Sequence, residues 1–333
     1  MKHYIEVRTV NKAKTDIDEL FSRWGCHNLS PRINGSSAVA RFAAKLTGVI
    51  RILTCAHKGD TLLLQYPMKK FYYTACTFAH WKGASVKTVV HDLGAFRRHK
   101  LTPEQENKRL SKTDVLIVHN ETMEKWVVGH GFNGQTVCLH IFDYLIDEKP
   151  HDYAVPHSPW RIVYAGGLYK WRNAYLYNLQ DCMAEWRLDL YGPGYEGDGS
   201  DDRIAYHGKL PEEKLMRDVE GDFGLVWDGG SLDECTGDWG EYLKINNPHK
   251  TSFYLSAGLP VIVWRKAAMK DFVEKNNIGF SIDSIRDLDG RLKNMTKDEY
   301  NAMRDNARRM GTLLREGHFT AKAFGFSSND DCE

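Results

Sequence analysis

The sequence lacks the features that mark secreted, membrane-spanning and zinc-stabilised proteins. Its seven cysteines are scattered, odd in number and never spaced as a CxxC pair, which argues against a disulfide framework and a structural zinc site. The first residues contain no apolar signal-peptide segment. No apolar run is long enough to cross a bilayer, and residues 46–56 are interrupted by Arg51. We therefore expect a protein of the reducing cytoplasm.

Charge and motif content disfavour two further classes of protein. The formal net charge is +1 over 333 residues, so no global field would draw the chain to nucleic acid, and we expect no nucleic-acid partner. The Gly-rich dinucleotide fingerprint is missing after the first expected strand, where residues 10–14 read VNKAK. A nicotinamide-dependent dehydrogenase is therefore disfavoured.

The length of the chain points to two domains, because one hydrophobic core rarely extends over 333 residues. Strand-like apolar runs alternate with helix-like periodicity in both halves, which predicts two parallel α/β layers. Residues 147–160 contain three prolines among several His and Asp residues and are expected to link the two layers. We predict domains over residues 1–150 and 151–316, followed by a tail over residues 317–333.

Apolar periodicity and turn residues predict the order of elements in each half. The expected strands cover residues 4–10, 61–67, 86–91, 114–118 and 137–141 in the first half, and 161–165, 188–191, 204–208, 224–227, 261–264 and 279–281 in the second. The expected helices cover residues 11–24, 37–54, 71–81, 215–219 and 297–314, with others starting near residues 102, 120, 168 and 248.

Residues 244–264 (KINNPHKTSFYLSAGLPVIVW) combine a capped helix with a buried strand. Asn247 is a good N-cap, Pro248 suits the first helical position, and Gly258 suits the left-handed residue that ends a helix. Amides at a helix start favour an anion, yet Lys250 lies in the first turn, where a cation opposes the helix dipole by a few tenths of a kcal/mol to about 1 kcal/mol. A phosphate between the amides and the ammonium group would explain this placement. An ordinary capped helix with a surface lysine is the alternative.

Glycines follow four of the strands that we expect in the second half. In open parallel sheets, ligands bind beyond the carboxyl ends of the strands. Glycines at successive strand ends favour a backbone that approaches a ligand closely. These strand ends are Gly166-Gly167, Tyr191-Gly192, His207-Gly208 and Asp228-Gly229-Gly230.

Several segments resemble one group of bacterial glycosyltransferases, which holds the galactofuranosyltransferases and the adhesin-modifying glucosyltransferases of cell-surface glycan assembly. The most specific match is the NNPHK and AGLPVI pair within residues 244–262. The similarity covers most of the chain. The other matching segments are residues 164–170 (YAGGLYK) and 223–228 (FGLVWD) in the second half, and 11–17 (NKAKTDI), 91–93 (HDL) and 114–120 (DVLIVHN) in the first.

This resemblance implies a GT-B fold, in which two tandem Rossmann-like domains face a central cleft and a final helix often crosses back to the first domain. It implies a hexosyltransferase that moves galactofuranose or glucose from a UDP-sugar to a glycan, glycolipid or glycoprotein acceptor, without a cofactor or a metal. Many retaining members of the fold have glutamates where this sequence has Ile245 and Phe253. Their absence favours an inverting mechanism.

On the donor side, the resemblance implies that amides and basic side chains stabilise the charge of the leaving diphosphate. Lys250 and Lys170 are the candidate cations, and the acidic loop at residues 198–202 is expected to be solvated rather than to bind metal. Tyr191 or His207 could stack on uracil, and Asp228 could hold a hydroxyl group; half-buried rings and a simple turn cap are the alternatives. The full expected donor set is Gly166, Gly167, Lys170, Tyr191, His207, Asp228, Asn246, Asn247 and Lys250.

On the acceptor side, an inverting transfer needs a base within hydrogen-bond reach of the acceptor hydroxyl. Asp92 and His91 follow a first-half strand and are the candidates. Asp92 is preferred because a carboxylate is deprotonated at neutral pH, with His91 orienting it or exchanging roles with it. Capping of the next turn is the alternative role for Asp92. Asn11, Lys12 and Thr15 are expected to line the acceptor side.

Three weaker expectations complete the sequence-based hypothesis. Asp143 and Asp147, near the expected hinge, form a second candidate pair for the base. Basic clusters at residues 69–70 and 97–100 would suit peripheral contact with the inner face of the plasma membrane, although solvated faces are the more ordinary explanation. A homo-oligomer is compatible with the sequence. The competing function is a non-catalytic nucleotide-sugar-binding partner of a glycosylation complex, which would keep the Lys250 site and lose the base.

Overall fold

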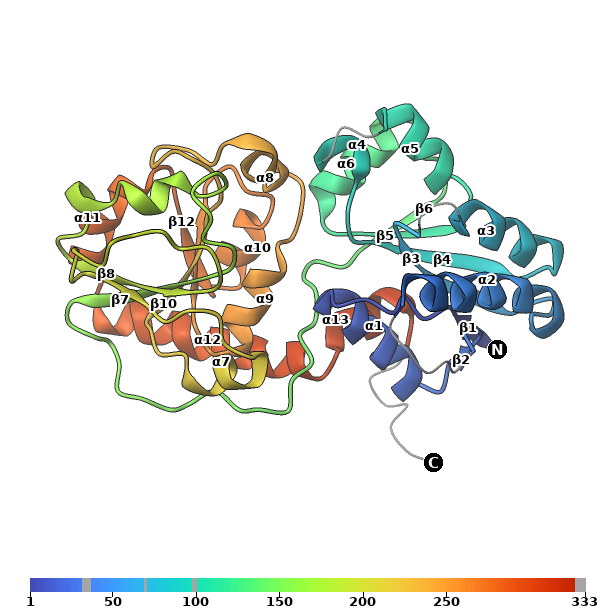
Figure 1. Cartoon of the computed structure of the whole chain (residues 1–333), viewed down its shortest axis with the longest axis horizontal. Coiled ribbons are helices and arrows are strands. Elements are labelled where there is room, and N and C mark those ends of the chain that lie inside the picture. The colour runs from blue at the N-terminus through green and yellow to red at the C-terminus, as the bar shows by residue number, and fades with distance from the viewer. Residues whose placement is uncertain (32–36, 69–70, 98–100, 327–333) are drawn as a thin grey trace. The chain divides into compact units, whose positions relative to one another are not determined.

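The computed structural model of the chain describes residues 1–31, 37–68, 71–97 and 101–326 (Figure 1). The chain forms two compact units, unit 1 from Met1–Asp143 with Gly317–Glu333 and unit 2 from Tyr144–Glu316. The basic residues expected at a membrane, at 69–70 and 98–100, lie outside the described residues. Among the residues that are described, no helix is both long and apolar enough to span a bilayer.

Unit 1 is built on a six-stranded parallel sheet of order β2-β1-β3-β4-β5-β6. The chain moves from β1 outward to β2 and returns to β3 on the other side, so the topological switch point lies between β1 and β3. The strands are β1 Lys2–Tyr4, β2 His27–Asn28, β3 Thr61–Tyr66, β4 Ser85–Val90, β5 Val115–Val118 and β6 Gln135–Cys138. The helices are α1 Lys12–Arg23, α2 Ala38–Cys55, α3 Phe71–Trp81, α4 Gly94–Arg97, α5 Pro103–Leu110, α6 Glu121–Gly129 and α13 His318–Phe324.

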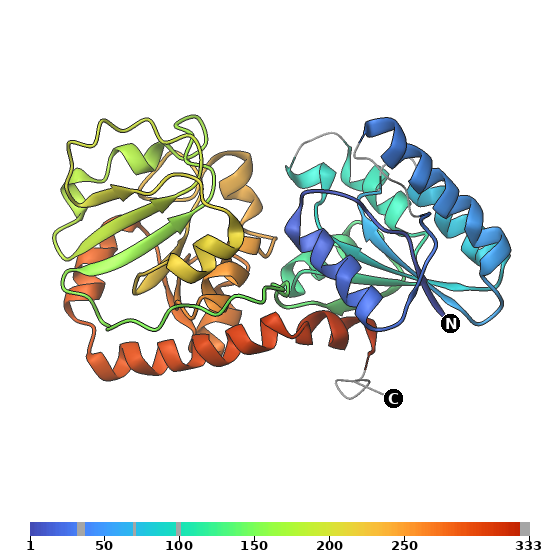
Figure 2. The same ribbon diagram turned by 60° about the horizontal axis from the view of Figure 1, so that its bottom comes forward.

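Unit 2 repeats the same plan with the order β12-β11-β10-β7-β8-β9, again with parallel neighbours throughout. Its switch point lies between β7 and β10. Its strands are β7 Trp160–Ala165, β8 Trp186–Tyr191, β9 Ile204–Tyr206, β10 Phe223–Val226, β11 Val261–Trp264 and β12 Gly279–Ile282. Its α-helices are α7 Glu212–Asp218, α8 Gly237–Tyr242, α9 His249–Ser256, α10 Lys270–Lys275, α11 Leu288–Lys293 and α12 Lys297–Arg315. Figure 2 shows the long α12 running along this unit.

The last described helix completes the core of unit 1 rather than that of unit 2. Phe324 of α13 is fully buried, and its ring meets that of Phe21 on α1 edge-to-face with centroids 4.9 Å apart. Asp143 accepts hydrogen bonds from the backbone amides of Phe319 (3.2 Å) and Thr320 (2.6 Å) at the start of α13. The chain therefore returns to unit 1 after α12.

The two parallel α/β layers expected from the sequence are confirmed, but three local predictions are wrong. The strand predicted at residues 4–10 ends at Tyr4, because the chain turns at Arg8 (φ 49°) and the Val7 amide bonds to Asp18. The helix expected after Gly167 is replaced by short 3-10 turns at Ala174–Tyr177 and Gln180–Cys182. Helix α9 begins at His249, so Pro248 occupies the N-cap position that the sequence assigned to Asn247.

Candidate functional site at the switch point of unit 2

The carboxyl ends of β7 and β10 lie side by side and are fixed by α9. The hydroxyl oxygen of Tyr254 on α9 accepts a hydrogen bond from the Ala165 amide (2.7 Å) and donates one to the Leu225 carbonyl (3.2 Å). Gly224 makes room for this ring, since a Cβ there would lie 2.1 Å from it. The start of α9 is thus held beside the switch point, where open parallel sheets bind ligands.

A buried ion cluster occupies this point. Lys250 Nζ lies 3.0 Å from Asp228 Oδ2 and donates to the Tyr164 hydroxyl at 3.0 Å, while Arg172 Nη2 lies 2.9 Å from Asp228 Oδ1. The side chain of Asp228 is 4% exposed and that of Lys250 12% exposed. Two cations thus share one carboxylate, which leaves an excess of positive charge among the three side chains.

Burial and ion pairing act in opposite directions on the pKa values of Asp228 and Lys250. Burial raises the pKa of Asp228, but Lys250 and Arg172 outweigh burial, so that the pKa lies below its ordinary value. Burial lowers the pKa of Lys250. The attraction of Asp228 raises this pKa but only partly offsets the effect of burial. A second anion near Lys250 would stabilise its charged form further.

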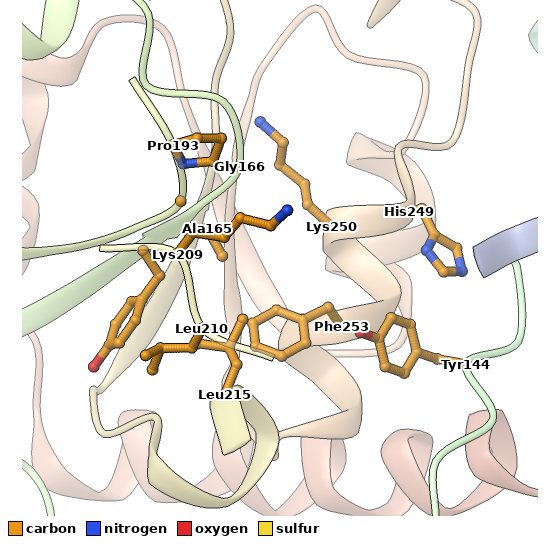
Figure 3. Close-up of a pocket in the computed structure, with 12 residues that line it drawn as sticks. Tyr144, Ala165, Gly166, Pro193, Lys209, Leu210, Leu215, His249, Lys250 and Phe253 are labelled. Carbon is orange, nitrogen blue, oxygen red and sulfur yellow. The ribbon is translucent and has the colours of Figure 1, made fainter. Parts of the chain in front are cut away.

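A cavity of about 240 Å³ opens next to the ion cluster. Figure 3 shows Lys250 extending from α9 on one side, with Lys209 and Leu210 entering from the other. Two lysines give the cavity a positive wall, and three aromatic rings give it an apolar one. The lining residues are Tyr144, Ala165, Gly166, Tyr191, Gly192, Pro193, Lys209, Leu210, Leu215, His249, Lys250 and Phe253.

The two rings predicted to stack on a base are stacked on each other. Tyr191 and His207 lie with centroids 4.5 Å apart and planes 10° apart. His207 Nε2 lies 2.7 Å from Asp189 Oδ1, and Arg161 holds the same carboxylate. Tyr191 lines the cavity, whereas His207 packs behind it, so the structure brings only Tyr191 to the Lys250 site.

Other residues of the expected donor set lie away from the cavity. Lys170 is exposed, and its ammonium group lies 5.6 Å from the centre of the Tyr177 ring. Gly167 accepts a hydrogen bond from Asn173 at its carbonyl (2.7 Å) and helps to shape the loop after β7. Asn247 is buried beneath the start of α9, and Asn246 is half-buried with its Oδ1 atom enclosed. These side chains do not line the cavity.

Two strand-end glycines are required by the chain itself. A Cβ on Gly192 would lie 1.8 Å from the Gly166 carbonyl oxygen, and one on Gly229 would lie 2.4 Å from the Thr236 nitrogen. Both positions have a positive φ, 140° for Gly192 and 128° for Gly229. Close backbone packing at the switch point therefore explains why these two positions are glycine, without a ligand.

The acidic loop at residues 198–202 is exposed apart from the half-buried Asp201. Asp198 Oδ1 accepts a hydrogen bond from the Ser200 amide, and Asp201 pairs with Arg203. Across the described residues, no three His, Cys, Asp or Glu side chains form a group that could hold a metal ion.

In unit 1, His91 belongs to a hydrogen-bond relay that fixes its tautomer. Gln65 Nε2 donates to the Lys14 carbonyl (3.1 Å) and to Asp18 Oδ1 (2.7 Å), which leaves Gln65 Oε1 to accept from His91 Nε2 at 2.7 Å. The assigned proton on Nε2 makes Nδ1 the basic nitrogen of a neutral His91. Burial raises the pKa of Asp18 to about 7, although the Val7 amide opposes the shift.

The remaining acceptor-side residues have local partners. Asn11 caps α1 by accepting from the Lys14 amide, Lys12 Nζ lies 3.0 Å from Asp16 Oδ1, and the Thr15 hydroxyl donates to the Lys12 carbonyl. These contacts account for the start of α1 without a ligand.

Asp92 and the alternative pair at the hinge lie in different surroundings. Asp92 is half-buried between β4 and α4, beside His91. Asp143 uses both carboxylate oxygens on the amides of α13, and Asp147 is exposed. Asp143 is therefore engaged in structure, and it does not form a pair with Asp147.

Three residues of the two sites escaped the sequence reasoning. Arg172 lies in the loop wrongly predicted to be a helix, and Lys209 directly follows His207-Gly208. Gln65 stands inside the apolar strand TLLLQY, where a buried polar side chain needs partners. The isolated polar residue in an apolar strand could therefore have identified Gln65 from the sequence. The ion pair of Arg172 could not have been predicted, because it depends on the path of an irregular loop.

Comparison with protein families matches both halves of the chain. The model described as the N-terminal domain of glucosyltransferase 3-like proteins covers residues 4–141, and that of the C-terminal domain covers residues 162–325. The β-1,6-galactofuranosyltransferase WbbI of Escherichia coli K12 is 30% identical over 262 residues, which cover 78% of this chain and 76% of WbbI. Glucosyltransferase 3 of Streptococcus gordonii is 24% identical over 93% of this chain and 91% of its own.

Solved structures share the fold at much lower sequence identity. Anabaena HepE in complex with UDP aligns over 97% of this chain and 99% of its own, with a TM-score of 0.61 and 11% identity. The lipopolysaccharide outer core galactosyltransferase WaaB aligns over 98% and 99%, with a TM-score of 0.62 and 12% identity. These matches confirm the expected GT-B type of fold with two Rossmann-like domains.

Proposed function

The chain belongs to the glucosyltransferase 3-like family, and we propose that it transfers a hexose from a UDP-sugar to a glycan acceptor. The relatives named above are a galactofuranosyltransferase and a glucosyltransferase, so galactofuranose and glucose are the donors to test first. The observation that supports the proposal most directly is the buried Lys250–Asp228–Arg172 cluster beside a positively lined cavity at a sheet switch point.

We propose that the diphosphate of the donor binds at the start of α9. Lys250 would exchange part of its contact with Asp228 for a phosphate oxygen, and Lys209 would approach from the opposite wall. Arg172 keeps Asp228 neutralised during that exchange, because its guanidinium already lies 2.9 Å from Oδ1. Tyr191 and Phe253 supply apolar surface for the base or the sugar.

The proposed chemistry is a single displacement. The acceptor oxygen attacks the anomeric carbon, the bond from that carbon to the β-phosphate oxygen breaks, and UDP leaves with the electron pair. The acceptor proton passes to a general base. Ile245 and Phe253 stand where retaining enzymes of this fold have glutamates, and both are buried apolar side chains. That absence, together with the engagement of Asp228 with two cations, supports the proposed inverting course.

We keep both candidates for the base. Asp92 is the first, because it needs no tuning to be deprotonated at neutral pH. His91 is the second, because Gln65 holds its Nε2 proton and leaves Nδ1 as the basic atom. With either base, the proposed reaction needs no metal, because cationic side chains and helix amides stabilise the charge of the leaving diphosphate.

The first test of the proposal measures binding of UDP. Lys250→Met should weaken UDP binding at least about tenfold by calorimetry, because it removes a charge-assisted contact to phosphate. Lys244→Met is the matched control, since Lys244 is half-exposed and pairs with Glu241. Unchanged UDP affinity in Lys250→Met would rule out the proposed diphosphate site.

Variants of the two candidate bases separate binding from chemistry. Asp92→Asn or His91→Gln should abolish transfer while UDP affinity stays unchanged, and whichever does so is the base. Transfer by the unaltered enzyme, assayed with a panel of UDP-sugars, should persist in excess EDTA. If none of the UDP-sugars is transferred although UDP binds, the protein is a nucleotide-sugar-binding partner and the catalytic proposal is wrong.

A further inference from the structure

Helix α2 of unit 1 exposes an apolar stripe to solvent. The exposed fractions are 78% for Val39, 43% for Phe42, 39% for Leu46 and 51% for Ile50. Their spacing places them within roughly 80° of the helix circumference, on one face. An apolar helix face of this kind is normally buried, and an exposed one marks an interaction surface.

Packing fixes this orientation of the helix. Ala44 and Gly48 face the unit, and a Cβ on Gly48 would lie 3.2 Å from Ile5 Cγ2. The helix therefore approaches the rest of unit 1 through its small residues, together with Val49 and Ile52. The apolar side chains of Val39, Phe42, Leu46 and Ile50 are left outside this contact, and their exposure follows from the close approach at Gly48.

The segment that contains α2 is also strongly basic, although the whole chain has a net charge of only +1. Residues 24–91 include nine Lys and Arg and a single acidic residue, Asp60. Asp60 is neutralised within the fold, since it lies 2.6 Å from the N-terminal ammonium group and 3.0 Å from His3 Nε2. The sequence of residues 24–91 therefore carries an excess of positive charge.

Within α2, the three charged residues are Arg41, Lys45 and Arg51, all of them basic. Helical spacing places Lys45 about 60° from the edge of the apolar stripe at Phe42, whereas Arg51 lies farther round on the other side and donates from Nη1 to the Leu29 carbonyl at 3.4 Å. A helix with an apolar face, basic flanks and no acidic residue has the composition of an interfacial helix, which lies in the plane of an anionic membrane.

We propose that the α2 stripe, defined as Val39, Phe42, Leu46 and Ile50, docks unit 1 on an anionic lipid surface. The four side chains would enter the boundary between headgroups and acyl chains, and the flanking cations would lie at the level of the lipid phosphates. This surface lies outside the Lys250 site, and lipid binding does not depend on the proposed transfer reaction.

The charge pattern favours an anionic membrane over two other partners of the stripe, a second copy of the chain and nucleic acid. In a symmetric dimer the same patch meets itself, which would bring one basic helix against another. Nucleic acid would be bound through its phosphates, to which the apolar side chains at the centre of the stripe offer no hydrogen bond. An anionic bilayer satisfies both the apolar centre and the basic flanks.

The test is co-sedimentation of the full chain with vesicles. The protein should bind vesicles of phosphatidylcholine with about 30% phosphatidylglycerol more strongly than phosphatidylcholine alone, and added salt should weaken the binding. Leu46→Ser/Ile50→Ser should lower the partition coefficient about tenfold or more, and Lys45→Gln should lower binding to the anionic vesicles alone. These variants should keep the melting temperature, because the altered side chains are exposed or half-exposed.

Val128→Ser is the matched control for Ile50→Ser, because Val128 on α6 is 50% exposed and lies outside the stripe. It should leave vesicle binding unchanged. Absence of binding to anionic vesicles, or equal binding by the stripe variant, would overturn the proposal. A dimer by light scattering that Leu46→Ser/Ile50→Ser converts to monomer, without vesicle binding, would instead identify the stripe as a contact between copies of the chain.

Discussion

At the scale of single residues, Asp143 should make unit 1 sensitive to pH. Its side chain is buried, and burial raises its pKa to about 7 even though the Thr320 hydroxyl and the Thr320 and Phe319 amides act in the opposite direction. The folded state therefore binds more protons than the unfolded state between about pH 4 and pH 7. Stability contributed by this group is present at low pH and is lost as pH rises through that window.

Asp143→Asn should remove this dependence. Between about pH 4.5 and 7.5, the unaltered protein should lose roughly 2–4 kcal/mol of unfolding free energy relative to the variant. The measurement is urea unfolding of unit 1 at a series of pH values. Glu104→Gln on α5 is the control, because a hydrogen bond from Thr102 lowers the pKa of the exposed Glu104 and its titration falls below this window. Parallel curves for Asp143→Asn and the unaltered protein would contradict the prediction.

Site residues that lie directly at or after the end of a strand could be predicted from the sequence. Lys250 and Asp228 were both predicted for the donor site, and the structure brings them within 3.0 Å of each other. Lys170 was placed in the same set, but its side chain is exposed and points to Tyr177. The role of Arg172 in neutralising Asp228 could not be predicted, because it depends on a loop whose path is set by Asn173 contacts rather than by periodicity.

At the scale of elements, α9 is positioned by close contact with α12. A Cβ on Gly311 of α12 would lie 2.3 Å from the Leu255 carbonyl oxygen on α9, so only glycine allows this approach. Gly311→Ala should destabilise unit 2 by about 1–3 kcal/mol, because the neighbouring atom is backbone and cannot move aside. The same displacement of α9 should weaken UDP binding a few-fold in calorimetry.

Gly290→Ala on α11 is the matched control for that helix substitution. No atom lies within 4 Å of a Cβ at Gly290, and the residue is in a helix interior. The control should therefore stabilise the protein by about 0.5–1 kcal/mol, through helix propensity alone. If Gly311→Ala behaved like Gly290→Ala, the packing of α9 on α12 would not be as tight as the structure indicates.

Elements with local signals were predicted well from the sequence, and elements with long-range causes were not. Helix α5 starts at Pro103 after a Thr102–Gln105 capping box, and α6 is capped by Asn120, as the residue types indicated. The first strand was predicted too long, because its end is set by a bond from the Val7 amide to Asp18, eleven residues away. The apolar residues of α2 predicted the helix but not that the α2 stripe faces solvent, since that depends on Gly48 packing against Ile5.

At the scale of the whole molecule, the chain enters unit 2 after Asp143 and returns to unit 1 at Gly317. Each unit has its own sheet and core, so the two should unfold as separate transitions. In scanning calorimetry, UDP should raise the transition of unit 2 selectively, because a ligand stabilises the state that binds it and the proposed diphosphate site consists of unit 2 residues.

Phe324→Ala tests the dependence of unit 1 on the end of the chain. Phe324 is fully buried against Phe21, and its loss should destabilise unit 1 by about 3–5 kcal/mol through lost burial and a cavity. The unit 2 transition and its response to UDP should stay unchanged. Lys322→Ala on the exposed face of α13 is the control and should shift neither transition. Equal shifts of both transitions in Phe324→Ala would mean that the units unfold together and that α13 stabilises them jointly.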